Sequence, residues 1–193
     1  MAGRGNSRAK NEIIEMLKED HLRVKKAFKT AEKLHSQEQN EELQALVEQT
    51  CAEVQVHAQL EEELFYPACR EAVKDEDLIE EAEVEHGSAK ALIEQLQGMS
   101  VEDPKYMATF KVLGEYLRHH IKEEENELFE QLSTGRSKVA WEELQQQMLT
   151  MQESLMAEMG LVVEEEQEEP QAPSRSRGRR RSEQSADQEE TVE

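Results

Sequence analysis

The sequence predicts an all-α fold: an antiparallel, up-and-down four-helix bundle with an additional C-terminal helix and a disordered tail. The first observation is composition, since the 193 residues include only 8 Gly and 4 Pro, and Glu, Gln, Leu and Ala are abundant. The second is periodicity, because apolar residues recur at three- and four-residue steps through most of the chain. The third is that short polar stretches separate these segments, which favours antiparallel neighbours.

The first helix is expected from about Asn11 to His35, behind a flexible basic N-terminus at residues 1–10. His21 lies within its apolar stripe, and residues 36–40 are expected to form a polar loop. The other members of the stripe are Ile14, Leu17, Val24, Phe28 and Leu34. A one-sided stripe of this kind is typical of a helix packed against a core.

The second helix is expected to begin near Glu41. Its apolar face carries His57 and Glu61, which are one turn apart. Pro67 lies near the end of this segment. Since proline lacks a backbone N–H, it is expected to kink or end the helix there.

The third helix is expected to start in the acidic run at residues 75–77, where negative charge suits the positive end of a helix dipole. It carries His86 on its apolar face and is expected to stop at Gly98. Its connection to the next helix is therefore short.

The fourth helix is expected to restart at Asp103-Pro104, an N-cap residue followed by proline at the first helical position. Its apolar face carries His120 and Glu124 in line with leucines. We therefore assign the four-helix bundle to residues 11–132.

An accessory helix is expected at residues 137–160, with Trp141 and several methionines covering one side or one end of the bundle. Residues 161–193 have almost no large apolar side chain, an acidic block and an arginine-rich run at residues 175–181. Such a segment cannot bury enough surface to offset the entropy of ordering it. We therefore expect a disordered acidic and arginine-rich tail.

Bulk properties exclude several classes of protein. The net charge of −21 argues against a nucleic-acid-binding core. The sequence has no apolar run of the ~20 residues that a membrane helix needs, and its basic, polar N-terminus is not a signal peptide. The two cysteines, Cys51 and Cys69, are too few for a disulfide framework. These features predict a cytoplasmic protein without a membrane partner, in which Cys69 is a packing residue.

One histidine lies on the apolar stripe of each of the four bundle helices. Two of them are followed four residues later by glutamate, in stretches at residues 57–66 and 120–129 that repeat one pattern. Residues four apart share a helix face, so each stretch presents an imidazole beside a carboxylate. The chain is an internal duplication of a helix pair and predicts a two-metal site. Its candidate ligands are His21, His57, Glu61, His86, His120 and Glu124.

A purely structural interpretation is the alternative, because 44 acidic residues make a histidine followed by glutamate frequent by chance. His119 and Glu123 form such a pair, but their face becomes polar, whereas His120 is in line with Leu113, Leu117 and Glu124. A core histidine alone is unremarkable. An ionised glutamate on a buried stripe is very costly without a partner or metal, which favours the metal site.

The set of four histidines and two glutamates, with Glu-Glu-Glu-Leu-Phe-Tyr-Pro after His57, resembles the hemerythrin-like (HHE cation-binding) domains over about Asn11 to Leu132. The resemblance implies a cofactor of two iron ions, a non-haem centre with an oxo or hydroxo bridge. It also implies that the histidines are terminal ligands and that Glu61 and Glu124 bridge the irons. Imidazole and carboxylate donors suit iron, with zinc and manganese as competitors.

The chain departs from the oxygen-carrying hemerythrins at two positions. Those proteins have a second histidine one turn after the third-helix ligand, where this chain has Lys90. They also bridge with an aspartate five residues after the fourth-helix histidine, where this chain has Glu125, or Glu124 at four. Reversible oxygen carriage by the standard site is therefore not expected.

Three functions fit these observations. The first is a di-iron protein that binds or senses O2, NO or peroxide, or holds iron. The second is a di-iron enzyme acting on peroxide or nitric oxide, so the sequence leaves open whether the chain is an enzyme. The third is a metal-stabilised module that binds a protein partner through its tail or accessory helix.

Overall fold

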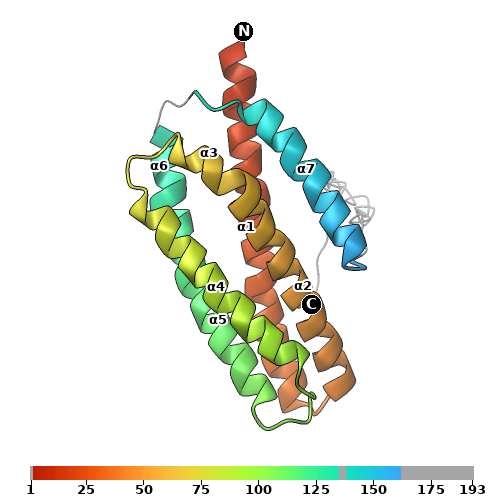
Figure 1. Cartoon of the computed structure of the whole chain (residues 1–193). Helices are drawn as coiled ribbons and strands as arrows, with labels where there is room; N and C mark the ends of the chain where they lie inside the picture. Colours follow the sequence, from red (N-terminus) through yellow and green to blue (C-terminus); the bar gives the residue numbers. More distant parts are fainter. Residues whose placement is uncertain (1, 135–137, 162–193) are drawn as a thin grey trace, which may run out of the picture. The chain divides into compact units, whose positions relative to one another are not determined.

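A computed structural model describes residues 2–134 and 138–161, and every regular element in these ranges is helical. The bundle helices are α1 (Ala2–Ser36), α2 (Asn40–Leu60), α4 (Asp77–Gln97) and α5 (Tyr106–Glu123). The connections α1–α2 and α4–α5 lie at the same end of the bundle (Figure 1). The predicted all-α, up-and-down architecture is confirmed.

α1 begins at Ala2, and not near Asn11 as the sequence analysis expected for a chain with a flexible N-terminus. The early turns have partners from the other end of the chain. The Asn6 side-chain amide donates to the Val139 carbonyl at 2.9 Å, and the Lys10 ammonium donates to the Leu132 carbonyl at 2.5 Å. These contacts, together with the burial of Ala9, extend the helix through the basic segment.

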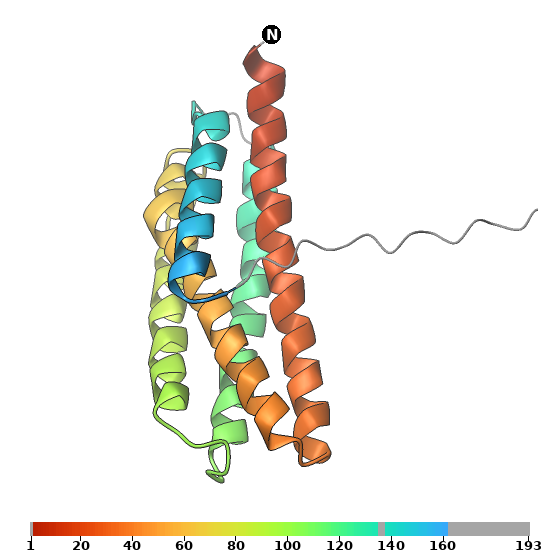
Figure 2. The same cartoon turned by 90° about the vertical axis from the view of Figure 1, so that its right-hand side faces the viewer.

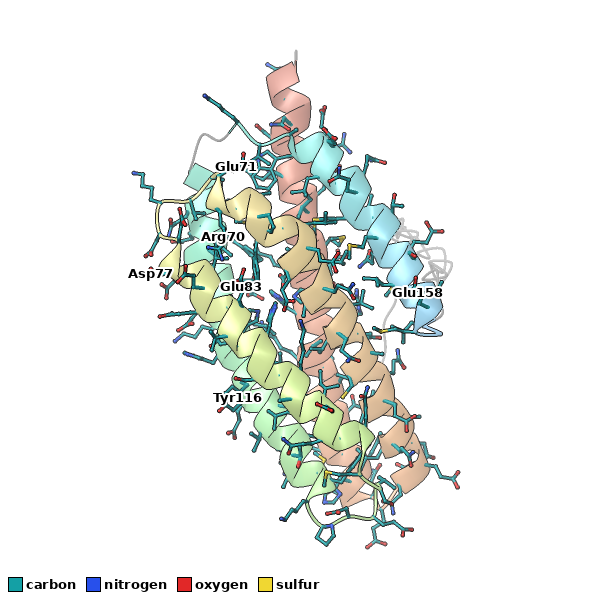
Figure 3. All side chains as sticks on the ribbon, viewed as in Figure 1. Arg70, Glu71, Asp77, Glu83, Tyr116 and Glu158 are labelled. Carbon is teal, nitrogen blue, oxygen red and sulfur yellow. The ribbon has the colours of Figure 1, made fainter. Side chains whose placement is uncertain are left out.

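The second helix does not end at Pro67. α2 continues into a π-helical segment, η1 (Glu61–Phe65), and then into α3 (Tyr66–Arg70). Pro67 lies in the first turn of α3, where proline is tolerated because backbone N–H groups there often lack an intrahelical partner. α3 is tied to α4 by the Arg70 guanidinium, which donates to Glu83 at 3.0 Å (Figure 3).

The fourth helix repeats this irregularity. α5 continues into a second π-helical segment, η2 (Glu124–Leu128), and then into α6 (Phe129–Thr134). Each π segment begins at a glutamate of the predicted metal site. Short π segments are typical of functional sites because the extra residue changes the direction of the neighbouring side chains.

One helix start differs slightly from expectation, and two helix ends agree with it. α5 begins at Tyr106, because the Asp103 carboxylate accepts a hydrogen bond from the Lys105 backbone at 2.7 Å and closes a turn ahead of the helix. α4 ends at Gly98 as predicted. The accessory helix α7 (Trp141–Glu158) is followed by Gly160 with φ of 69°, the left-handed conformation that glycine favours.

α7 packs against α1 and α2 and covers one side of the bundle (Figures 1 and 2). Its buried face consists of Trp141, Leu144 and Met148. No described helix is long and apolar enough to cross a membrane. The predicted tail lies, apart from Leu161, outside the described residues.

The core consists of two apolar clusters separated by a polar layer. One cluster surrounds Leu17, Leu60 and Phe65, and the other surrounds Val47 and Phe110. Along each bundle helix, the predicted histidine lies between residues of the two clusters. The fold therefore encloses the polar side chains in apolar surroundings, where charges need partners.

Candidate metal centre

The bundle brings all six predicted ligand residues together. α1, α2, α4 and α5 each contribute one buried histidine, and the two π segments begin with the buried glutamates. The Nε2 atoms of His21 and His57 are 3.2 Å apart, and those of His86 and His120 are 3.1 Å apart. Four imidazole nitrogens thus converge from four helices.

The two carboxylates connect the histidine pairs. Glu61 Oε2 lies 3.1 Å from His57 Nε2 and 3.4 Å from His86 Nε2. Glu124 Oε2 lies 3.2 Å from His21 Nε2 and 3.8 Å from His120 Nε2. Each glutamate therefore reaches a histidine of its own helix pair and a histidine of the other pair.

The donor atoms form two groups that could each hold a metal ion, with all atoms of a group within 4.8 Å of one another. Glu61 belongs to both groups. The first group consists of His21, His57, Glu61 and Glu124. The second group consists of Glu61, His86 and His120. Glu61 Oε1 and Glu124 Oε2 are buried without a hydrogen-bond partner. Such oxygens are rare in native cores, and a bound cation would satisfy them.

The other ring nitrogen of every histidine faces a carboxylate from a neighbouring helix. The Nδ1-to-oxygen distances are 3.0 Å for His21 and Glu125, 3.2 Å for His57 and Asp20, 3.1 Å for His86 and Glu62, and 3.0 Å for His120 and Glu85. A carboxylate at Nδ1 fixes the proton there and leaves Nε2 free as a ligand. All four imidazoles are therefore oriented with Nε2 toward the centre.

Three of these outer carboxylates also bind a permanent cation. Lys25 Nζ lies 3.0 Å from Glu125, Lys90 Nζ lies 2.6 Å from Glu62, and Arg23 pairs with Asp20. Lys90, which occupies the sequence position of an additional hemerythrin ligand, thus points to an outer carboxylate and not to the centre. Glu125 likewise lies outside the centre, while Glu124 faces it.

Sequence reasoning did not select Asp20, Glu62 or Glu85, and it considered Glu125 only as a possible bridging ligand. The sequence contains a signal for them. His21 and His86 each directly follow an acidic residue, and each is followed by lysine four positions later. A second glutamate also directly follows each of Glu61 and Glu124. The internal repeat therefore includes the acidic and lysine neighbours of the candidate ligands as well as the ligands themselves.

Tyr66 is a further polar side chain at the centre that was not predicted. Its hydroxyl donates to Glu124 at 3.3 Å and to Glu61 at 3.4 Å, and its ring stacks on His86 with centroids 5.6 Å apart. Phe129 occupies the equivalent place in the second half, where it stacks on His21 with centroids 6.2 Å apart. The two halves therefore differ close to the centre by this one hydroxyl group.

Burial and neighbouring charges shift the pKa values within the centre. Burial lowers the pKa of His57, but adjacent carboxylates, led by Glu61, outweigh it and raise the pKa well above its usual value. Burial and the charges of neighbouring histidines lower the pKa of His86 to about 3. Burial and the charge of Glu124 raise the pKa of Glu61. These buried histidines and glutamates compete for the same protons, which a bound metal ion would displace.

The thiols fit the expected packing role. Cys51 and Cys69 are both buried and unpaired by disulfide. Burial, with the charge of Glu48, raises the pKa of Cys51 to about 12, and burial raises the pKa of Cys69 well above its usual value. Neither cysteine has the accessible thiolate that reactive cysteines need.

A small cavity of about 30 Å³ adjoins the histidine side of the centre. All four inward histidines line it, whereas Glu61, Glu124 and Tyr66 do not. Its other walls include Val24, Val54, Leu117, Gln152 and Met156. A space of this size holds roughly two water-sized molecules, so it admits a diatomic molecule or peroxide.

The two remaining histidines, His35 and His119, lie away from the centre. His35 is exposed near the end of α1. The His119 side chain is 62% exposed and faces Glu85 and Glu123. His120 and not His119 therefore points inward.

Comparison with known proteins identifies a matching family and a similar fold. The family model of the hemerythrin HHE cation-binding domain matches residues 12–132. A solved structure of a hemerythrin HHE cation-binding domain-containing protein from Mycobacterium kansasii has a TM-score of 0.61 and 24% identity, covering 75% of this chain and 86% of that chain. This likeness supports the fold.

A DNA nickase from Nostoc sp. (strain PCC 7120) is 26% identical over 125 residues. The match covers 65% of this chain but only 34% of that protein. This chain therefore spans about a third of that relative's length.

Proposed function

Since the chain belongs to the hemerythrin HHE cation-binding domain family, we propose that it is a non-haem di-iron protein that binds or senses O2, NO or peroxide, or holds iron. One observation carries the proposal: four inward imidazole nitrogens and two buried carboxylates form two ligand groups that share Glu61. A shared carboxylate is the arrangement that two neighbouring ions require.

The residues fit such a cofactor. His21 and His57 would hold one iron, His86 and His120 would hold the other, and Glu61 and Glu124 would span them. The carboxylate oxygens that lack a hydrogen-bond partner are those that a cation would satisfy. A set of nitrogen and oxygen donors without thiolate suits iron, with zinc and manganese as competitors. Iron would supply redox chemistry and an open coordination position.

The chain's own side chains define what this centre can accept. The outer carboxylates hold each imidazole with Nε2 inward, which preserves the ligand geometry during ligand exchange. The Tyr66 hydroxyl donates to both glutamates and restrains their orientation. The cavity at the histidine side combines apolar walls, among them Val24 and Leu117, with polar side chains such as Gln152, and its volume of about 30 Å³ suits a small molecule. These features support recognition of a diatomic molecule or peroxide.

The cavity provides a test of small-ligand binding. Leu117→Phe should fill the cavity, while Leu113→Phe adds the same volume one turn earlier, at a buried position that does not line it. In reduced, iron-loaded protein we expect Leu117→Phe to weaken NO binding by about tenfold or more with unchanged iron content, and Leu113→Phe to leave NO affinity near that of the parent. Equal NO affinity in the parent and both variants, at full iron content, would contradict the proposed binding site.

An enzyme acting on peroxide or nitric oxide is the second candidate, because the same cavity and open coordination position would serve turnover. Peroxide consumption by the iron-loaded protein above the rate of an equal amount of free iron would assign it as the function. A metal-stabilised interaction module is the third candidate, and one tight zinc per chain with no reaction toward O2, NO or peroxide would favour it.

Two further assignments belong to the proposal. We place the protein in the cytoplasm, where its unpaired thiols suit a reducing compartment. The DNA-directed activity in the name of the Nostoc relative is not carried over, because this chain covers a third of that protein and has a net charge of −21, which opposes binding to DNA.

A further inference from the structure

A second cluster of metal-binding side chains lies on the outer surface of α4 and α5. His119 Nε2 is 3.2 Å from Glu123 Oε1 and 3.7 Å from Glu85 Oε1, and the three donor atoms lie within 4.8 Å of one another. The face is open to solvent, since Tyr116, one turn before His119, is 48% exposed and lies at the outer side of α5 (Figure 3). An ion from solution can therefore reach the cluster.

The charge pattern around the outer carboxylates gives an independent reason to expect a cation here. Asp20, Glu62 and Glu125 each pair with a lysine or arginine. Within the described residues, Glu85 has ion-pair partners only in histidines, and Glu123 adds a second negative charge beside it. The fourth outer carboxylate thus lacks the permanent cation that its three counterparts have.

We propose that Glu85, His119 and Glu123 bind a single divalent transition-metal ion at the protein surface, separate from the buried centre. One imidazole and two carboxylates are suitable ligands for Zn²⁺ and Fe²⁺, and water completes the coordination on the exposed side. The pair on one helix face, His119 and Glu123, has the spacing of a helical metal clip, and Glu85 adds a ligand from the adjacent helix.

Glu85 couples this surface site to the buried centre. Its Oε1 faces His119, while its Oε2 accepts the Nδ1 hydrogen bond of His120 at 3.0 Å. A cation on Glu85 withdraws charge from that hydrogen bond, so His120 becomes a weaker ligand for the buried metal. This coupling rests on the proposed function of the buried centre, whereas the surface site does not. By linkage, loss of the buried metal changes the affinity of the surface ion by the same factor.

The test is calorimetric titration of Zn²⁺ into iron-loaded, full-length protein, with iron retention measured afterwards. We expect one Zn²⁺ to bind per chain without loss of iron, and the His119→Ala and Glu123→Gln variants to bind it about tenfold or more weakly, or about 1.4 kcal/mol. Glu127→Gln changes an exposed glutamate one turn further along and should bind Zn²⁺ like the parent. Unchanged Zn²⁺ binding in both His119→Ala and Glu123→Gln overturns the surface site.

The coupling has a separate readout. Zn²⁺ should shift the absorption spectrum of the buried iron in the parent and in Glu127→Gln, but not in His119→Ala. Zn²⁺ binding without a spectral shift would retain the surface site and overturn the coupling. If the protein holds no iron, the proposed function fails, and the surface site is still decided by whether metal-free His119→Ala binds one Zn²⁺ fewer per chain than the metal-free parent.

Discussion

The two halves of the bundle, α1 with α2 and α4 with α5, are two versions of one structural unit. Each half supplies an acidic residue and a histidine in succession on its first helix, and a histidine with two glutamates on its second. Each second helix becomes π-helical at the first of those glutamates. The comparison shows that the duplication preserves the backbone irregularity and the supporting carboxylates as well as the ligands.

Neither half forms a complete centre alone. Asp20 supports His57 within the first half and Glu85 supports His120 within the second. The other two supports cross between the halves, since Glu62 contacts His86 and Glu125 contacts His21. Glu61 and Glu124 also cross between the halves, since each lies near a histidine of the other half. Association of the halves therefore creates the site, which explains why it lies at the centre of the bundle.

The differences between the halves are local. Tyr66 places a hydroxyl between the two glutamates where the second half has Phe129. Arg23 pairs with Asp20 on one side, whereas His119 faces Glu85 on the other. The first difference affects the buried centre, and the second creates the proposed surface site. Substitutions at equivalent positions of the two halves can therefore distinguish properties common to both halves from properties of one half.

The largest effect is expected from removing one inward ligand. His120→Ala should lower bound iron from two per chain to one or none, while His119→Ala should retain both, because adjacent helix residues differ in direction by about 100°. The loaded protein should also lose the stabilisation that metal gives, about 4 kcal/mol at free metal 1,000 times Kd. Elemental analysis and thermal unfolding measure the two effects. Loss of iron in His119→Ala with retention in His120→Ala would reverse the assignment of the inward histidine.

A smaller loss is expected from the outer carboxylates. Glu62→Gln and Glu125→Gln keep side-chain size but remove the charge at His86 Nδ1 and His21 Nδ1, so each should weaken metal affinity about 10- to 100-fold. Glu63→Gln, at the exposed neighbour of Glu62, is the matched control. Competition with a chelator gives the affinities. Similar losses in both halves would support their equivalence, and parent-like affinity in both would show that the outer carboxylates are dispensable.

Packing between the halves is tested at Gly114. A Cβ atom there would lie 2.8 Å from the Phe28 ring of α1, so Gly114→Ala should destabilise the protein by about 1–3 kcal/mol. At Gly87 of α4 a Cβ meets no atom within 4 Å, and Gly87→Ala should stabilise by about 0.4–1 kcal/mol. Urea unfolding of both variants measures the difference. A stability for Gly114→Ala equal to that of Gly87→Ala would mean that the α1–α5 approach is looser than described.

The smallest change makes the first half resemble the second. Tyr66→Phe removes only the hydroxyl, which costs about 0.5–1.5 kcal/mol in lost hydrogen bonding, and should leave two irons per chain. It should alter the absorption spectrum, because both glutamates lose a donor. Phe129→Leu, which removes the ring stacked on His21, controls for a change in packing. A spectrum identical to that of the parent would place the hydroxyl outside the influence of the metals.

The fold and the inward side chains follow from the sequence because they depend on helical periodicity. His21, His57, His86 and His120 lie on apolar stripes, and periodicity together with the internal repeat predicted that they point inward and that His119 does not. The π segments were not predicted, because a one-residue widening leaves no periodic signal over a few residues. The extension of α1 to Ala2 was missed because its contacts, such as Asn6 with Val139, join distant parts of the chain.

The supporting residues were harder to predict for a related reason. Glu62, Glu85 and Glu125 are partly exposed on helices rich in acidic residues, so composition gives no reason to select them. Their role depends on the rotation of one helix against another, which places each carboxylate at the Nδ1 of a histidine on a neighbouring helix. Comparing the two halves position by position would have identified them.

The most direct test of the account is the metal content of the full-length protein after anaerobic loading with Fe²⁺ and removal of excess ions at neutral pH. We expect two buried irons per chain and an oxo-bridge absorption after exposure to air. The His119→Ala variant should retain both irons, and because it lacks the proposed surface site, no surface ion is counted with them. A single iron per chain in His119→Ala would contradict a dinuclear centre bridged through Glu61 and Glu124.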